Sequence, residues 1–379
     1  MATEQIPITP GLVMWARERA GLTLEDAVKK FPRIEDWEQG VSYPTYPQLE
    51  QLSEYLKLPI AVFFFPTPPR VPAIRETFRT LPDVEFEHIP SKIRLLLRKA
   101  KALQLNLVEL TQGRNPAARL ITRDLTTKPT ANVKQLAIKV REYLGVTLDE
   151  QTGWLSDEVA LKKWRSALLR AGIFVFKDAF KVDEFSGFCL YDEEFPIIYV
   201  NNSSAKTRQI FTFFHELAHL LFHTSGVDTL TDVYVPNLHG DAHRIEVLCN
   251  RFAAEFLLPP EAFDAAILGR QITEEFTEEL AARFHVSREM VFRRFLDRGS
   301  ISEAKYRKAT ARWNAQRQEG GQGGDYYWTK LTYLGREYVA LALTQFRQNR
   351  IDETQLAEYL DTKARNVGNL EEYFVKRVV

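Results

Sequence analysis

The chain has few cysteines and no excess of either charge, and each shortage excludes a class of protein. Its 379 residues include only 2 Cys, Cys189 and Cys249, which excludes a disulfide scaffold and fits a reducing compartment. Lys and Arg number 50, as do Asp and Glu, so any affinity for nucleic acid has to come from a local patch. The length exceeds one comfortable hydrophobic core, so we expect two or three domains.

A long apolar run and a leader sequence are also missing. The apolar stretch Ile60–Phe65 is far shorter than the ~20 residues that a membrane-spanning helix needs. The start, Met1–Gln5, lacks the basic residues and apolar core of a secretory signal. Hydrophobic residues make up 45% of the sequence, which indicates a folded chain. We therefore expect a globular, soluble, cytoplasmic protein with no membrane segment.

The most informative stretch is His215-Glu216-Leu217-Ala218-His219, whose apolar flanks contain no Pro or Gly and predict a helix. On a helix, His215 and His219 lie one turn apart on one face, and both imidazoles can bind one metal ion. Zinc suits this pattern because it accepts imidazole and carboxylate ligands and keeps one position open for water. Glu216 would project beside the histidines and take a proton from that water. The pattern predicts a metal-dependent hydrolase, with peptide bonds as the preferred substrate.

Two histidines leave a zinc site one protein ligand short. The variant of the motif with a third histidine is absent, because Phe222 and Ser225 stand where it needs Gly and His. His223 adds another turn to the histidine row, but three successive turns of a straight helix cannot converge on one ion. We therefore expect His223 to support the site or to cap the helix.

A carboxylate from a second helix is the alternative third ligand. The apolar-striped run Arg244–Leu258, ended by Pro259, predicts that helix, and it carries two glutamates. We favour Glu246, whose apolar neighbours imply that its helix packs against another element. Glu255 is the competitor, although an exposed helix glutamate needs no function. Asn250 shares a face with Glu246, and its amide could hold the carboxylate or a histidine ring.

These residues resemble the ImmA/IrrE zinc metallopeptidases over roughly Thr130–Pro260. The similar segments are Gly172–Phe176, Ser186–Phe188, Pro196–Asn201, Phe211–His223 and Glu246–Pro259. The resemblance implies a small gluzincin-like α+β protease, with His215, His219 and Glu246 as zinc ligands and Glu216 as the base. It also implies a protein substrate, because the family is associated with cleavage of helix-turn-helix repressors in phage, mobile-element or stress-response settings.

Three short β-rich runs precede the histidine helix, at Ile173–Phe176, Gly187–Tyr191 and Pro196–Val200. The last run could accept an extended peptide by edge pairing, although a purely structural strand is the favoured interpretation. Hydrolysis also needs a donor for the developing oxyanion. The sequence does not choose among the three candidates, which are Tyr199, His239 and His243.

The flanking regions predict mostly helical domains around an α+β, gluzincin-like core. Residues 1–68 are expected to form a degenerate XRE-like helix-turn-helix domain of four or five short helices, and 69–129 a linker and a helical segment. Residues 130–265 are the predicted zinc metallopeptidase domain, and 266–318 a helical, helix-turn-helix-like segment. After a flexible break at Gln318–Asp325, residues 325–379 are expected to form an α+β tail that begins with a strand at Tyr326–Lys330.

The N-terminal region resembles the XRE/Cro type because Trp37-Glu38-Gln39-Gly40 matches the usual end of its third helix. However, Pro32–Asp36 is too short for a turn and a full recognition helix. Its acidic residues Glu35 and Asp36, with Glu38, would face phosphate unfavourably. We therefore favour protein contact over DNA binding for this domain.

A second helix-turn-helix candidate follows the predicted protease domain. Thr277–Phe295 has the rhythm of two short helices, with Ser287 as a cap and Arg288, Arg293 and Arg294 as charged residues. Contact with DNA through residues 277–298 and plain helix packing both remain open for this segment.

The leading hypothesis is a Zn²⁺-dependent endopeptidase that cleaves a partner protein, a transcriptional repressor by the resemblance. The alternative from another class is a DNA-binding or toxin/antitoxin-binding transcriptional regulator that retains a protease-like scaffold. A third, weaker interpretation is a hydrolase of a non-peptide amide.

Overall fold

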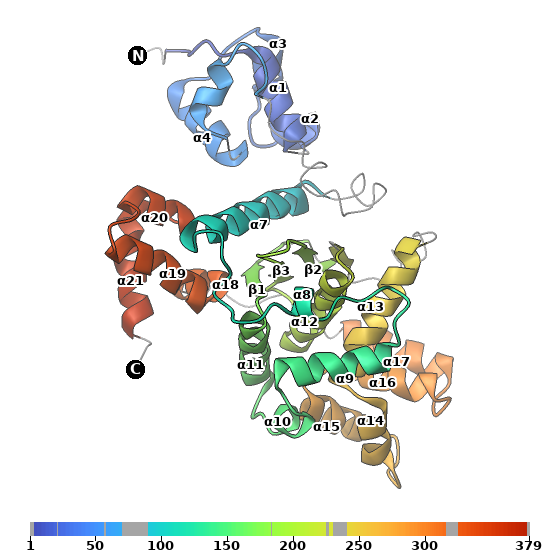
Figure 1. Ribbon diagram of the computed structural model, residues 1–379. Coiled ribbons are helices and arrows are strands. Elements are labelled where there is room, and N and C mark those ends of the chain that lie inside the picture. Colours follow the sequence, from blue (N-terminus) through green and yellow to red (C-terminus); the bar gives the residue numbers. More distant parts are fainter. Residues whose placement is uncertain are drawn as a thin grey trace. The chain divides into compact units, whose positions relative to one another are not determined.

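The computed structural model (Figure 1) describes residues 4–20, 22–56, 58–69, 90–182, 184–224, 227–229, 241–315 and 325–376. The chain divides into two compact units, Met1–Lys99 and Ala100–Val379. None of the helices within the described ranges combines the length and the apolar character that crossing a bilayer requires. The expected flexible break lies outside the described residues, apart from Asp325.

The N-terminal unit contains the short helices that the sequence predicts. They are α1 (Pro10–Arg19), α2 (Leu24–Val28), α3 (Ile34–Gln39), α4 (Tyr46–Leu56) and the 3-10 helix η1 (Ile60–Phe64). The Thr23 side chain accepts a hydrogen bond from Asp26 N and so starts α2, and Gly40 ends α3 with a left-handed φ of 71°. Trp37 and Ile34 of α3 are buried in the core of this unit.

Glu38 of α3 points inward, not toward a DNA groove. Its carboxylate accepts hydrogen bonds from Arg17 of α1, with Nε–Oε1 and Nη2–Oε2 distances of 2.6 and 3.1 Å. The two side chains are only 11% and 8% exposed. The expectation that Glu38 would face phosphate is therefore wrong, because a paired carboxylate inside the unit is not presented to any ligand.

The second unit opens with helices that lead into a small sheet. The helices are α7 (Ser91–Leu110), whose first residues belong to the N-terminal unit, α8 (Ile121–Asp124), α9 (Val133–Leu144), α10 (Leu148–Thr152) and α11 (Asp157–Arg170). Side chains of Asn132, Thr147 and Ser156 cap the N-termini of α9, α10 and α11. These caps fix where each helix begins, and the apolar stripes then face the core.

The sheet has four strands in the order β1-β3-β2-β4. The strands are β1 (Phe174–Asp178), β2 (Phe185–Leu190), β3 (Ile197–Asn201) and β4 (Val227–Thr229). β1 runs parallel to β3, whereas β2 is antiparallel to both β3 and β4. Both sides of β3 are paired, so the idea that β3 accepts a peptide at a free edge is wrong, and β3 is the structural strand that we favoured.

Helix α12 (Lys206–Leu221) packs on one face of this sheet and against α13 (Asp241–Leu257) (Figure 1). Val175, Ile198 and Val200 belong to the same hydrophobic core as the apolar residues of α12. At Gly187 of β2, an added Cβ would lie 2.5 Å from Thr212 Cγ2 of α12. Only glycine permits so close an approach of helix and strand.

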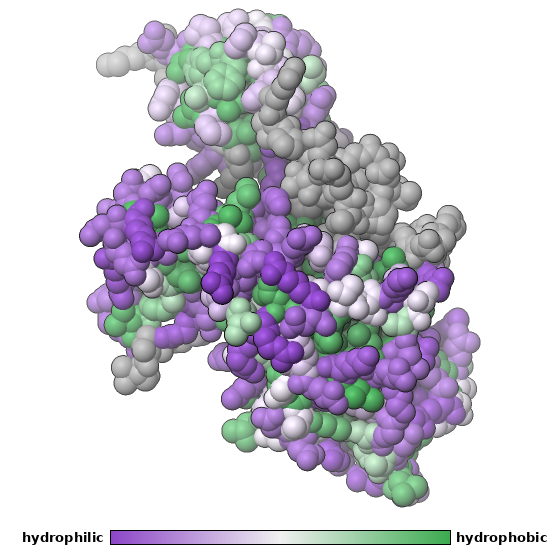
Figure 2. Space-filling model, in the orientation of Figure 1, coloured by the Kyte–Doolittle hydropathy of each residue, from purple (hydrophilic) through white to green (hydrophobic). Residues whose placement is uncertain are grey.

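Helices make up the described rest of this unit. They are α14 (Pro260–Ile267), α15 (Glu274–Phe284), α16 (Arg288–Asp297), α17 (Glu303–Ala315), α18 (Tyr326–Leu334), α19 (Arg336–Arg347), α20 (Glu353–Tyr359), η3 (Ala364–Asn366) and α21 (Val367–Lys376). The described part of the chain thus combines many helices with one small sheet, an α+β organisation as expected. On the face drawn in Figure 2, hydrophilic residues cover most of this unit, and hydrophobic residues lie between them in small groups.

The predicted strand at Tyr326–Lys330 is wrong, because these residues form the start of α18. The Asp325 side chain accepts a hydrogen bond from Trp328 N at 2.8 Å and so caps this helix. Tyr327 packs against Tyr373 of α21, with ring centroids 5.1 Å apart. The cap and the helix–helix packing outweigh the β preference of aromatic residues, and the described tail is helical, not α+β.

The arginines of the second helix-turn-helix candidate are engaged within the protein. Arg288 pairs with Glu278, Arg293 pairs with Asp297, and Arg294 donates to Leu258 O. Ser287 caps α16 as expected, accepting from Met290 N. These contacts favour the interpretation of α15 and α16 as a packed helix pair.

Candidate metal centre

Helix α12 is buried along most of its length, including both histidines of the motif. Its residues from Gln209 to Leu221 are buried, apart from a partly exposed Phe211. A helix that is apolar on nearly all sides belongs in a protein interior. The histidines and Glu216 inside it therefore need polar partners or a bound ion to compensate for lost hydration.

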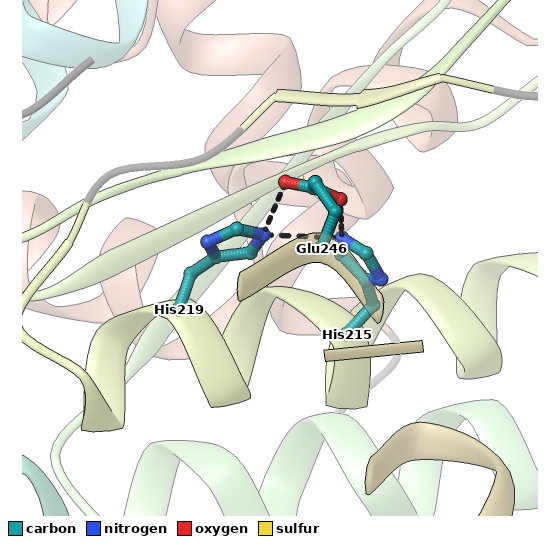
Figure 3. Close-up of side chains that lie close together, drawn as sticks. All are labelled: His215, His219 and Glu246. Carbon is teal, nitrogen blue, oxygen red and sulfur yellow. Dashed lines mark hydrogen bonds and ion pairs between the residues drawn. The ribbon is translucent and has the colours of Figure 1, made fainter. Parts of the chain in front are cut away.

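Three side chains from two helices converge at one point (Figure 3). His215 Nε2 and His219 Nε2 lie 3.2 Å apart. Glu246 of α13 brings Oε2 to 3.3 Å from His215 Nε2 and Oε1 to 3.0 Å from His219 Nε2. The three residues are 0%, 3% and 9% exposed, respectively. The structure thus brings together the three predicted ligands, although Glu246 follows His215 by 31 residues and His219 by 27.

The spacing of these atoms fits a tetrahedral divalent ion. Nitrogen and oxygen ligands at about 2.0–2.1 Å from zinc are separated from one another by about 3.3 Å. The distances of 3.0–3.3 Å among Nε2 of His215, Nε2 of His219 and the Glu246 carboxylate match that separation. Two imidazoles and a carboxylate also leave one position open. The residues therefore form a site suited to a divalent metal.

The surroundings of Glu246 favour the ionised form of its carboxyl, which is the form that binds a metal. Burial by itself would raise the pKa of this carboxyl, but the facing imidazoles of His219 and His215 outweigh that effect. The pKa of Glu246 is consequently held well below its usual range, and the side chain is ionised at neutral pH.

Nδ1 of each histidine in the metal centre lies close to a side-chain oxygen. Asn250 Oδ1 lies 3.1 Å from His215 Nδ1, the contact that the sequence suggested for this amide. Thr224 Oγ1 lies 3.4 Å from His219 Nδ1 and donates to His219 O. With Nδ1 protonated toward these oxygens, each Nε2 keeps its lone pair for a metal. Sequence reasoning missed Thr224, because after the helix it assigned a role to His223 alone.

Two other candidates lie outside the ligand group. Glu255 pairs with Arg251 at 3.0 Å and is not the third ligand. His223 follows the C-terminus of α12 in a left-handed conformation, with φ of 57°. Its ring stacks on Tyr191 and its Nε2 lies 3.0 Å from Thr122 O. The expected helix-end role for His223 therefore agrees with its position.

Of the three candidate donors to the oxyanion, the structure excludes one, keeps a second and does not describe the third. Tyr199 stacks on Phe188, and its hydroxyl donates to Asp178 at 3.2 Å. Because its neighbours Ile198 and Val200 face α12, Tyr199 points to the opposite face of the sheet and is excluded as a donor at the site. His243 is half-buried on α13 one turn before Glu246, so it remains a candidate. His239 lies outside the described residues.

Comparison with known proteins identifies the segment that holds this centre. The family model described as the IrrE N-terminal-like domain (Peptidase_M78) matches residues 169–296. The radiation response metalloprotease IrrE of Deinococcus deserti is similar, with 36% identity over 99 residues. That match covers 26% of this chain and 34% of the relative, so the chain spans about a third of the length of the curated protein that it matches. Residues 169–296, which contain His215, His219 and Glu246, are thus similar to the IrrE N-terminal-like domain.

Proposed function

We propose that this protein is a zinc-dependent endopeptidase that cleaves a partner protein. The observation that carries the proposal is the convergence of His215, His219 and Glu246 from α12 and α13 at tetrahedral spacing. Glu216, the next residue after His215, is fully buried on the same helix. A carboxylate held inside the protein beside a metal-binding group suits the role of general base.

The role that we assign to each residue in peptide hydrolysis follows from the chemistry of its side chain. His215, His219 and Glu246 would hold the ion, and Asn250 and Thr224 would hold the two imidazoles in the binding orientation. Bound zinc would lower the pKa of a water from roughly 15.7 to about 7 and polarise the scissile carbonyl. Glu216 accepts the proton from the attacking water and passes it to the departing amine. His243 is our candidate donor for the oxyanion.

The substrate class and setting rest on the family. A relative is named a radiation response metalloprotease, which supports a role in a stress response. We propose a helix-turn-helix transcriptional repressor as the substrate, in a stress, phage or mobile-element response. We assign the peptidase to residues 130–265 with a gluzincin-like core, and the N-terminal helices to a degenerate XRE-like domain used for protein contact. The two buried thiols, Cys189 and Cys249, suit the cytoplasm.

The regulator alternative is less favoured. It needs a DNA-reading surface, and the arginines of α16 are occupied by Glu278, Asp297 and Leu258 O. Sequence-specific retention of DNA by the metal-free protein would reverse this preference.

The test is cleavage of candidate repressors, co-expressed from neighbouring genes, by paired variants. Glu216→Gln should keep about one zinc per chain and abolish cleavage, because only the base is lost. His215→Ala should lose both zinc and cleavage. Glu255→Gln, a matched glutamate on the same helix as Glu246, should keep both. Retained cleavage by Glu216→Gln would rule out this mechanism, and metal-independent cleavage would rule out the metal centre.

A further inference from the structure

A cavity unrelated to the metal centre lies in the second unit. It has a volume of about 1380 Å³ and is lined by α11, β1, the start of α12 and helices α18, α19 and α21. Neither metal-binding histidine nor Glu246 lines it. Pockets for small molecules typically measure ~300–1,000 Å³, so the space is sufficient for such a ligand.

The lining of this cavity is cationic, although the whole chain is neutral. Six basic side chains and two carboxylates line it. The basic ones are Lys162, Arg165, Lys177, Lys181, Lys206 and Arg336, and the acidic ones are Glu158 and Glu337. Glu158 is shared by Lys162 at 3.4 Å and Lys206 at 3.2 Å, so it neutralises only one of the two. The excess positive charge favours an anionic ligand.

Lys177 is the most unusual member of the lining. It is only 4% exposed, and its Nζ donates to Gln209 Oε1 of α12 at 2.9 Å. Burial, reinforced by Arg165 and Lys206, lowers the pKa of Lys177 to about 6, with Glu158 opposing and Lys162 adding to the shift. At neutral pH this amine is mostly uncharged, and an arriving anion would favour its protonation.

The C-terminal helices supply aromatic side chains to the same cavity. Tyr326 and Trp328 of α18, Tyr338 of α19 and Phe374 of α21 are among them. Aromatic rings offer stacking surfaces to flat ligands. Arg165 of α11 donates hydrogen bonds to Val175 O of β1 and Thr332 O of α18, and so joins these elements. We therefore assign contact with the anion to the lysines.

We propose that this cavity binds a small anionic ligand with a flat aromatic ring, of the nucleotide class, through Lys162, Lys177 and Lys206 on one side and the aromatic residues of α18 and α21 on the other. Lys206 begins α12, and Gln209 lies a turn further along. The ligand therefore contacts the helix that carries His215 and His219.

The test uses the full-length, metal-loaded chain and ATP labelled with N-methylanthraniloyl as a fluorescent probe. Binding should saturate, and unlabelled ATP should displace the probe more strongly than either adenosine or inorganic triphosphate. Lys162→Gln and Lys206→Gln should each weaken binding by about fivefold or more. Lys163→Gln is the matched control, because Lys163 is the exposed neighbour of Lys162 on α11 and does not line the cavity. It should bind as the unmodified chain does.

Proton uptake gives a readout independent of affinity. Calorimetry at pH 7 in two buffers of different ionisation enthalpy should detect proton uptake on ATP binding, and Lys177→Met should abolish it. Failure to bind the probe at millimolar concentration would overturn the proposal. Equal weakening by Lys163→Gln, or tighter competition by a hexaglutamate peptide than by ATP, would overturn it as well. Peptidase activity enters none of these measurements, so they stand apart from the proposed catalytic function.

Discussion

Asn250 Oδ1 lies 3.1 Å from Nδ1 of His215, and Asn250 comes one turn after Glu246 on α13. The helix that supplies the carboxylate thus also orients an imidazole of α12. Because the amide oxygen accepts a hydrogen bond from Nδ1–H, it fixes the tautomer in which the lone pair of Nε2 can bind metal.

Replacing Asn250 with alanine should weaken zinc binding by about 10–100-fold, the usual effect of losing such a supporting partner. Competition with a fluorescent chelator measures the affinity. Arg251→Ala is the control, because that side chain is the next on the helix, is 65% exposed and pairs with Glu255, which lies outside the metal centre. Unchanged zinc affinity in Asn250→Ala would show that the amide does not orient the ring.

The metal centre was predictable because its signals are local. A helix with His215 and His219 one turn apart needs only apolar flanks, and Glu246 follows from a second apolar stripe and the family resemblance. The role of Thr224 was not predictable, because it depends on how α12 ends. The direction of Tyr199 was not predictable either, because it depends on which face of the sheet α12 covers.

The fold was predictable where residue periodicity and tertiary packing agree. The short N-terminal helices and the three strands before α12 follow from their patterns. The start of α18 was misread because its aromatic residues favour strands, whereas Asp325 and Tyr373, distant from each other in sequence, stabilise a helix. Similarly, nothing local to Glu38 indicates that Arg17 lies beside it.

Lys177 should make stability depend on pH. Its folded pKa is about 6, against an ordinary value of 10.5, so between these values the unfolded chain binds the additional proton. The free energy of unfolding should therefore rise with pH in this window, by up to about 1.4 kcal/mol per pH unit from this group. Lys177→Met should flatten that rise, measured by urea unfolding between pH 6.5 and 9. The same slope in Lys177→Met would contradict the assignment, and Lys163→Met should leave the slope unchanged.

Gly335 joins α18 to α19 with a φ of 88°, and a Cβ there would lie 2.7 Å from Arg165 Nη2. Gly335→Ala should therefore destabilise the protein by about 1–3 kcal/mol. Thermal unfolding followed by circular dichroism would measure the loss. Gly368→Ala is the matched control, because nothing lies within 4 Å of its added Cβ, and it should be neutral or slightly stabilising. Equal effects of the two changes would refute the steric argument.

Glu38→Ala should destabilise the N-terminal unit by about 3 kcal/mol, because it leaves the Arg17 guanidinium buried without its carboxylate. The hydrogen bond that Arg17 donates to Glu38 raises the pKa of Arg17 more than burial lowers it, so the charged guanidinium depends on Glu38. Glu35→Ala, an exposed change on the same helix, should cost little. Denaturant unfolding of the full chain, followed by circular dichroism, distinguishes the two variants. A small loss of stability in Glu38→Ala would contradict this prediction and mean that Arg17 forms hydrogen bonds with water or another residue.

The outer side of β1 is occupied by this chain's own residues, since Arg165 donates to Val175 O at 3.0 Å and α18 packs along the strand. No strand of a neighbouring molecule can add to the sheet there. A product cut before Tyr326 would uncover Phe174, Phe176 and the edge of β1, an apolar template for self-association. The C-terminal helices therefore cover one edge and an apolar part of β1, and their loss should lower solubility while leaving His215, His219 and Glu246 in place.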